Sequence, residues 1–215
     1  MLLLLIRHGD TDLTAKQLVG RTPGVALNAE GRRKAEALVT RLEGVPLAAV
    51  YSSPLERAMQ TAEPLALARG LSIQSEAGLA EVDYGAWTGR PFTELRRTDL
   101  WKRIQQRPAD ARFPEGEAIR EAQARIMAAI ERIFHQHPRS AVAVVSHSDV
   151  IKAGVAHLLG LHLDFLQRLA VSPASVTAML LGDHQPRLLH LNDTGSLLDL
   201  RPARRPRQAR RNAQN

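Results

Sequence analysis

Short apolar runs and longer amphipathic segments alternate along most of the chain. The clearest runs are almost uninterrupted by polar residues, which is typical of parallel strands buried on both faces of a sheet. The pattern predicts four strands, over residues 2–6, 47–53, 71–76 and 140–148.

The amphipathic segments carry apolar residues at the three- and four-residue spacing of one helix face. Asn28 can cap a helix that continues until Gly44 ends it. Residues 117–137 predict a second, longer helix of the same kind.

A further helix is predicted directly after the strand at 47–53, and its start has a strong local signal. Ser53 is the expected N-cap, Pro54 takes the first helical position, and Glu56 closes a capping box. This start places Arg57 in the first turn of the helix.

Near the C-terminus, strand-like segments at 175–181 and 187–191 flank the turn sequence GDHQP, which predicts a hairpin. The earlier strands instead alternate with helices, which is typical of parallel strands joined by crossover helices. We therefore predict an α/β fold. It is a three-layer sandwich with a mostly parallel central sheet, helices on both faces and the late hairpin at one edge.

Composition and charge divide the chain into a body and a tail. The 215 residues are 44% hydrophobic, which is enough for one domain with a substantial core, and we assign this domain to residues 1–200. Residues 201–215, RPARRPRQARRNAQN, hold six arginines and no acid, so they account for most of the net charge of +7. We predict that they form a disordered Arg- and Pro-rich tail.

The same features limit the partners and the compartment. The chain has no cysteine, and its apolar start at residues 2–6 is too short for a signal peptide or a membrane span. We expect a cytoplasmic protein without a membrane partner. Because the body is nearly neutral, we expect nucleic-acid contacts from the tail at most. The oligomeric state stays open, with a homodimer as one option.

Charged side chains gather where two of the apolar strands end. The first strand leads into Arg7 and His8, and the last of the four predicted strands leads into His147. If these strands are neighbours, both imidazoles lie at the carboxyl edge of the sheet, where α/β proteins bind ligands, and Arg57 can reach them. Guanidinium groups match phosphate oxygens and oppose a metal ion, so the set predicts a phosphate site and no metal.

Four motifs in this order resemble those of the histidine phosphatase superfamily, the phosphoglycerate mutase-like proteins. The motifs are RHG at 7–9, SSPLERAMQTA at 52–62, LAEVDYGAWTG at 79–89 and VVSHS at 144–148. The resemblance covers about residues 2–195. It is closest to the broad-specificity and α-ribazole phosphatases, because FPEGEAIREAQAR resembles their P-x-G-E-S segment, with Ala118 in place of the serine.

The resemblance implies that His8 is a nucleophile that forms a phosphohistidine, and that Arg7, Arg57 and His147 bind the phosphoryl group. Elementary chemistry agrees with these roles. A neutral imidazole nitrogen can attack phosphorus while a hydrogen bond holds the other ring nitrogen in its protonated form. Fixed cationic donors then stabilise the charge on the phosphoryl oxygens.

The resemblance also assigns an acid. Glu81, in LAEVDYG, is the implied proton donor to the leaving oxygen, and Asp83 is the alternative acid on the same segment. Nearby phosphate charge would raise the pKa of such a carboxyl and favour its protonated form.

Several positions are expected to contact substrate or phosphate. Thr14 stands where the family often has an asparagine, and its hydroxyl can still donate one hydrogen bond to phosphate. Arg21 is the expected contact for a second anionic group. The remaining expected contacts are Gly20, Tyr84 and Ser148.

We predict a phosphomonoester hydrolase that acts through a phosphohistidine on a small phosphorylated metabolite and needs neither a metal nor a cofactor. The stretch from Glu81 to Pro114 is short for the insertion that covers a mutase site, so water competes as phosphoryl acceptor. Two alternatives stay open. They are a cofactor-dependent phosphoglycerate mutase and a non-catalytic module that binds a phosphorylated ligand.

Overall fold

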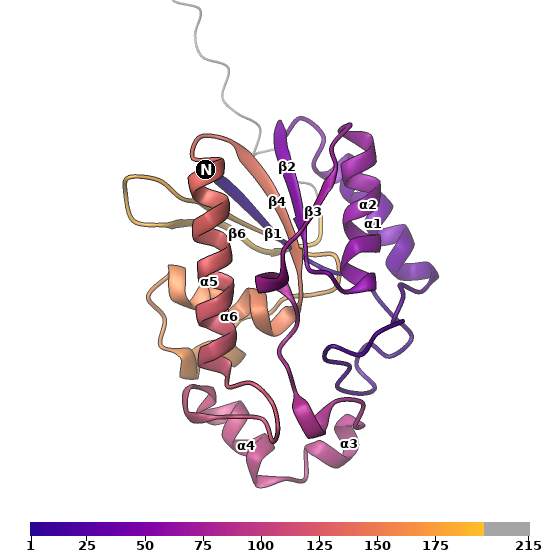
Figure 1. The fold of residues 1–215 in the computed structure, drawn as a ribbon, viewed down its shortest axis with the longest axis vertical. Coiled ribbons are helices and arrows are strands. Elements are labelled where there is room, and N and C mark those ends of the chain that lie inside the picture. The colour runs from indigo at the N-terminus through magenta and orange to yellow at the C-terminus, as the bar shows by residue number, and fades with distance from the viewer. Residues whose placement is uncertain (196–215) are drawn as a thin grey trace, which may run out of the picture.

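A six-stranded sheet in the order β3-β2-β4-β1-β5-β6 forms the centre of the molecule (Figure 1). The computed structural model describes residues 1–195. The strands are β1 (Leu2–Arg7), β2 (Leu47–Ser52), β3 (Ile73–Ser75), β4 (Ala141–Ser146), β5 (Val176–Leu180) and β6 (Arg187–Asp193).

The pairing of the strands confirms the predicted fold class. Strand β4 lies between β1 and β2 and is parallel to both, and β3 continues the parallel set beyond β2. Strand β5 is antiparallel to β1, and β6 pairs antiparallel with β5 as the predicted hairpin at the edge.

Helices cover both faces of the sheet, and the apolar side chains of β1 pack against the helices on each side. Leu4 and Ile6 belong to the hydrophobic cluster that includes residues of α1 (Ala29–Arg41) and α2 (Glu56–Ala68). Leu3 and Leu5 belong to the cluster shared with α5 (Ile119–Gln136) and α6 (Ser148–Leu158). Because successive side chains of a strand point to opposite faces, a buried strand needs apolar residues at every position.

A third group of helices lies beyond the carboxyl ends of the parallel strands, at the bottom of Figure 1. It contains α3 (Phe92–Leu95), α4 (Asp99–Gln106) and short 3-10 turns at Gly85–Trp87 and Pro108–Asp110. Two further 3-10 segments, Ala77–Leu79 and Leu163–Arg168, occupy other connections. The sequence pattern does not predict α3, α4 or α6.

The predicted start of α2 is wrong by two residues. The helix begins at Glu56 after Leu55, without a side-chain cap, so Ser53 is not its N-cap. Ser53 is still tied to the sheet, because its backbone N–H donates to the Val145 carbonyl. The displaced start nevertheless leaves Arg57 in the first turn, as predicted.

The boundary predicted near residue 200 and the tail at 201–215 lie outside the described residues, so both remain predictions. Within the part of the chain that is described, no helix is long and apolar enough to cross a membrane.

Candidate active site

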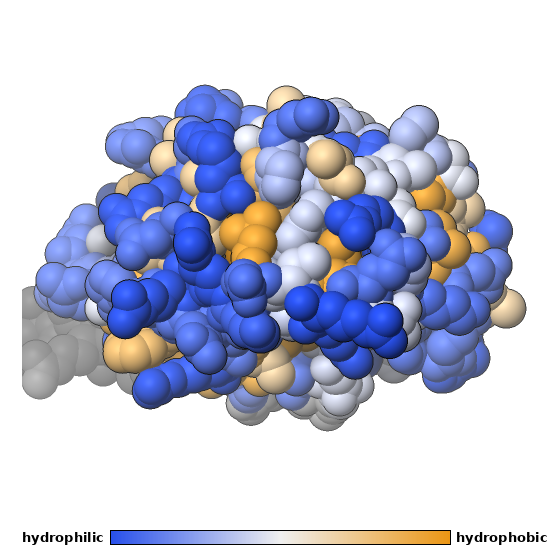
Figure 2. All heavy atoms as spheres, turned by 90° about the horizontal axis from the view of Figure 1, so that it is seen from below, coloured by the Kyte–Doolittle hydropathy of each residue, from blue (hydrophilic) through white to orange (hydrophobic). Residues whose placement is uncertain are grey.

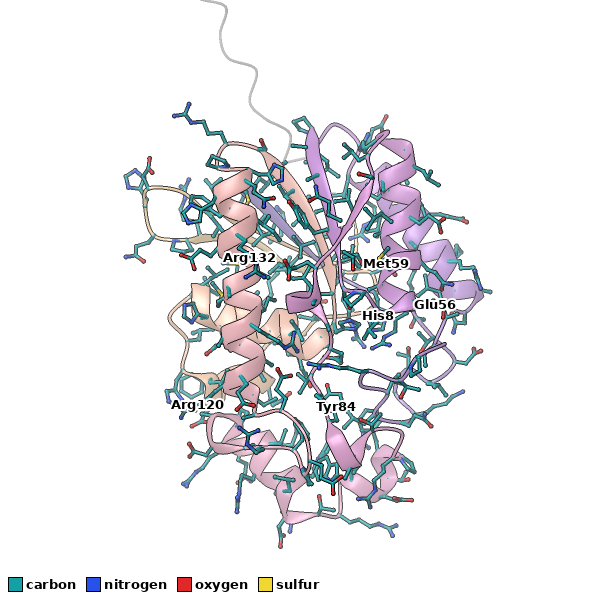
Figure 3. The ribbon with its side chains drawn as sticks, in the orientation of Figure 1. His8, Glu56, Met59, Tyr84, Arg120 and Arg132 are labelled. Carbon is teal, nitrogen blue, oxygen red and sulfur yellow. The ribbon has the colours of Figure 1, made fainter. Side chains whose placement is uncertain are left out.

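The two histidines that follow β1 and β4 lie side by side at the carboxyl edge of the sheet. Parallel pairing sets Arg7 opposite Ser146, so His8 and His147 emerge next to each other. Their ring centroids are 5.1 Å apart, and both residues are buried. Figure 3 shows His8 below the sheet, facing the segment that carries Tyr84.

The two ring nitrogens of His8 have different partners. Nδ1 lies 2.7 Å from the Gly9 carbonyl, which can only accept, so Nδ1 carries the proton. Nε2 is therefore unprotonated and accepts from Arg57 Nε at 3.2 Å. Burial, and then the charges of Arg57 and Arg7, lower the pKa of His8 to about 3. The imidazole is neutral over the whole physiological pH range, with its lone pair on Nε2.

Arg57 joins the two histidines to the loop at Gly20. Its Nη2 donates to the Gly20 carbonyl at 2.7 Å and lies 3.2 Å from His147 Nδ1. Since a guanidinium can only donate, Nδ1 accepts, and the His147 proton lies on Nε2, which donates to Ser53 Oγ at 2.8 Å. Burial and the neighbouring charges of His8 and Arg57 lower the pKa of His147 well below its ordinary value.

Arg7 supplies a second buried guanidinium. One end is anchored, because Nη1 donates to the Val171 carbonyl at 2.6 Å. Its Nε is buried and has no hydrogen-bond partner. An unsatisfied buried donor is costly, so an anion that accepts from this group would gain affinity from it. Burial lowers the pKa of Arg7 and of Arg57.

Glu81 is the buried carboxyl of the cluster. Its side chain accepts from the Val82 N–H at 2.9 Å, and Oε2 lies 3.9 Å from His147 Nδ1. Burial, and then the negative charge of Asp149, raise the pKa of Glu81 to about 7, against the opposing effect of Arg57. A carboxyl with this pKa can both give and take a proton near neutral pH.

The raised pKa of Glu81 predicts a pH-dependent stability. Because the folded pKa exceeds the ordinary value of 4.5, the folded state binds this proton more tightly. The free energy of unfolding then falls as pH rises from about 4.5 to about 7, by up to ~3 kcal/mol. In chemical denaturation, Glu81→Gln is expected to be more stable relative to wild type at pH 8 than at pH 4.5. A difference that stays constant with pH would contradict the raised pKa.

These groups lie at one end of a cavity of about 300 Å³. Eight of the residues that the sequence points to line it, namely Arg7, His8, Thr14, Gly20, Arg57, Glu81, Tyr84 and Ser148. His147 is fully buried beneath them. Arg21 and Asp83 are not among the lining residues.

The residues at the cavity that we expect to contact substrate or phosphate are fixed by different interactions. Thr14 Oγ1 accepts from the Thr11 N–H at 2.9 Å. Gly20 has a φ of +54°, and a side chain there would come within 3.0 Å of the Tyr84 ring. The Tyr84 hydroxyl donates to Asp149 at 3.0 Å. Tyr84 and Asp149 therefore form one rigid wall of the cavity.

Arg21 faces the rear of the Glu81 segment. Its Nε donates to the Glu81 carbonyl at 2.8 Å, and Nη2 pairs with Glu117 at 3.3 Å. Arg125 makes the same two kinds of contact, with the Glu81 carbonyl at 3.0 Å and with Glu117 at 2.7 Å. Glu117 also accepts from the Asp83 N–H at 3.2 Å, so one carboxylate holds both arginines and the backbone of this segment.

Sequence reasoning missed several residues at the cavity. Asp149 directly follows the SHS motif and lies in the first turn of α6, but nothing in the sequence indicates its contact with Tyr84. The missed lining residues also include aromatic, aliphatic and amide side chains at Gln17, Leu18, Phe92, Trp101, Ile104, Gln105, Phe113 and Gln167. Within residues 1–195, no group of three or more His, Cys, Asp or Glu side chains is placed to hold a metal ion.

Fold and cluster together define a three-layer α/β protein with paired histidines and arginines at the carboxyl edge of its sheet. The chain belongs to the histidine phosphatase superfamily (branch 1), whose sequence profile matches residues 3–194.

The relatives that the chain resembles are named for different activities. The chain is 28% identical over 197 residues to phosphoserine phosphatase 1 of Hydrogenobacter thermophilus, covering 89% of this chain and 92% of that one. It is 30% identical over 186 residues to the probable phosphoglycerate mutase GpmB of Shigella boydii, covering 86% and 85%. The α-ribazole phosphatase from Shigella flexneri superposes with a TM-score of 0.81 at 26% identity, covering 91% of this chain and 98% of that one.

Proposed function

We propose that the protein is a phosphomonoester hydrolase that works through a phosphohistidine at His8. The state of the His8 imidazole carries this proposal, because Nδ1 is fixed by the Gly9 carbonyl and leaves Nε2 unprotonated. A neutral, oriented nitrogen beside two guanidiniums is suited to attack a bound phosphoryl group. Family membership and the phosphatases among the relatives support the same reaction.

In the first step, His8 Nε2 forms a bond to phosphorus while the bond to the ester oxygen breaks. Arg7 and Arg57 stabilise the phosphoryl oxygens, and the phosphate replaces His8 as an acceptor for Arg57. Glu81 gives its proton to the leaving alkoxide. In the second step, Glu81 takes a proton from water, the water oxygen bonds to phosphorus, and the bond to Nε2 breaks. Inorganic phosphate and neutral His8 result.

The negative charge of the phosphate also changes the state of His147. Burial and nearby positive charge keep this imidazole neutral in the free protein. A bound dianion opposes both effects, so protonation of Nδ1 becomes more favourable and supplies another donor to the phosphoryl oxygens.

Phosphate release with excess chelator tests the proposal. We expect wild-type protein to release phosphate from p-nitrophenyl phosphate at an unchanged rate in chelator, and acid-free quenching to trap a phosphoprotein. A cofactor-dependent mutase would instead isomerise 3-phosphoglycerate, once primed with 2,3-bisphosphoglycerate, faster than it releases phosphate. Absence of both reactions would favour a non-catalytic binding module.

The contacts of Glu117 predict that it positions Glu81 without touching the substrate. Glu117→Ala removes the carboxylate that Arg21, Arg125 and the Asp83 N–H share, so the segment is held less firmly by its remaining contacts. We expect kcat for an alkyl phosphate to fall about 10- to 100-fold with little change in KM, because small misplacements of catalytic groups are costly. Glu117→Gln should recover part of the loss.

Glu131 offers a matched control for this experiment, because it lies on the same helix as Arg125 and its side chain is 73% exposed. Glu131→Ala should leave kcat unchanged. Equal effects of the two alanine variants, or a rise in KM alone for Glu117→Ala, would contradict a positioning role.

A further inference from the structure

The end of the cavity away from the histidines has a distinct chemistry. Its apolar wall consists of Leu18, Phe92, Trp101, Ile104 and Phe113. The rings of Phe92 and Trp101 meet edge to face, with centroids 5.8 Å apart. Amide side chains complete this end of the cavity. Helices α3 and α4, which carry Phe92, Trp101 and Ile104, lie beyond the carboxyl edge of the sheet where His8 emerges (Figure 1), so a leaving group attached to the phosphate would extend toward this wall.

Helix α4 turns its apolar side to the cavity and its cations to solvent. Trp101, Ile104 and Gln105 line the cavity and share one helix face through their three- and four-residue spacing. Lys102 and Arg103 between them are exposed. Figure 2, which views this end of the molecule, shows a largely hydrophilic surface with smaller apolar areas near its centre.

In the part of the chain that the structure describes, positive charge in the cavity lining is confined to the phosphate end. Arg7 and Arg57 are the cationic residues of this lining, and both belong to the histidine cluster. Lys152 stands outside the lining and pairs with Asp149 at 3.5 Å and with Gln167 at 3.4 Å. Arg21 is held at the rear of the Glu81 segment. Within residues 1–195, a second anionic group on the substrate therefore has no cation in the cavity lining to receive it.

We propose that the preferred substrates are phosphomonoesters of uncharged alcohols with an aromatic or apolar body, an inference that rests on the proposed function. Such a body gains from burial against the rings of the apolar wall. A carboxylate in the same place would lose water without gaining a partner, and the Asp149 carboxylate would repel it. The amides can accept or donate hydrogen bonds to hydroxyl groups on the alcohol.

Three esters with alkoxide leaving groups test this preference, namely benzyl phosphate, glycerol 3-phosphate and 3-phosphoglycerate. We expect kcat/KM for benzyl phosphate to exceed that for 3-phosphoglycerate by about 30-fold or more, with glycerol 3-phosphate between them. Equal or higher kcat/KM for 3-phosphoglycerate would overturn the inference.

Variants on α4 separate recognition of the alcohol from recognition of the phosphate. Trp101→Ala should lower kcat/KM for benzyl phosphate about tenfold and leave glycerol 3-phosphate within about twofold. Lys102→Ala, at the exposed neighbouring position, is the matched control and should change neither. Gln105→Lys places a cation at the cavity and should raise kcat/KM for 3-phosphoglycerate about fivefold or more. A Trp101→Ala loss that is equal for all three esters would count against the assignment.

A binding measurement keeps the inference independent of turnover. Calorimetric titration of His8→Ala with benzyl phosphate and with 3-phosphoglycerate should give at least about tenfold tighter binding of benzyl phosphate. If no ester is hydrolysed but this ratio holds, the hydrolase proposal fails and the ligand class stands. If hydrolysis occurs without the ratio, or neither ester binds, the ligand class fails.

Discussion

Replacing His8 with alanine is expected to lower kcat for every phosphate ester by about 10⁴-fold or more, which is about 5 kcal/mol of transition-state stabilisation. The reason lies in the chemistry and not in binding. The two guanidiniums and His147 remain to hold the phosphate, but no nitrogen remains to accept the phosphoryl group. Rapid-quench assays should therefore show substrate binding without a phosphoprotein.

Two variants control for damage to the fold. His8→Asn keeps a donor that can reach the Gly9 carbonyl, so it should fold as wild type does and still lack turnover. His135→Ala removes an imidazole that is 71% exposed and should retain full activity. Residual turnover of His8→Asn above about 1% of wild type would argue for direct attack of water on the substrate, without a covalent intermediate.

The strands were predictable because burial on both faces imposes a simple pattern. Leu3, Leu4, Leu5 and Ile6 are all apolar because alternate residues contact different helix layers. The hairpin near the C-terminus was predictable from its turn residues. These signals depend on the local sequence alone, so they can be recognised without knowledge of the tertiary structure.

The start of α2 shows where local signals fail. Ser53 Oγ accepts from the Leu55 N–H at 3.3 Å, which is the kind of bond that an N-cap makes, but it also accepts from His147. The Ser53 N–H donates to Val145 as well, and with these tertiary contacts at Ser53 the helix begins only at Glu56. Helices α3 and α4 were missed for another reason. They are short, with four residues in α3 and eight in α4, so each offers too few turns for its periodicity to stand out, even though α4 has a clear apolar face.

The order of the motifs and the ends of the strands predict the histidines and arginines of the phosphate site. They do not predict the residues that surround this cluster. The contacts of Glu117 with Arg21, Arg125 and the Asp83 N–H join three separate stretches of the chain. Such contacts depend on how loops pack. Gly85 illustrates this packing, because its φ is +51° and a side chain there would clash with the Pro114 carbonyl at 2.1 Å. The sequence predicts that Arg21 contacts a second anionic group of the substrate. In the structure Arg21 contacts the Glu81 carbonyl and Glu117, so this role stays a prediction.

Glu81→Gln should have the second-largest effect, and its size should depend on the leaving group. For an alkyl phosphate we expect kcat/KM to fall about 10³-fold, since a poor leaving group needs the proton. For p-nitrophenyl phosphate the loss should be about tenfold or less, because its phenolate leaves without protonation. The glutamine keeps the size of the side chain and its acceptor for the Val82 N–H.

The pH profile adds a second signature of the same group. An acid must be protonated to act, and the pKa of Glu81 is raised to about 7, so kcat/KM for the alkyl ester should decline as pH rises above about 7. Glu81→Gln should lose this alkaline limb and keep the acidic limb that titration of the substrate phosphate produces.

Asp83 provides the matched control, as the other carboxyl of the segment that the sequence offers as an acid. Its side chain is 46% exposed and lies outside the cavity lining, and Oδ1 accepts from the Gly85 N–H. Asp83→Asn can keep that hydrogen bond, so both esters and the alkaline limb should stay near wild type. Equal losses on the two esters in Glu81→Gln, or a missing alkaline limb in Asp83→Asn, would transfer the acid role away from Glu81.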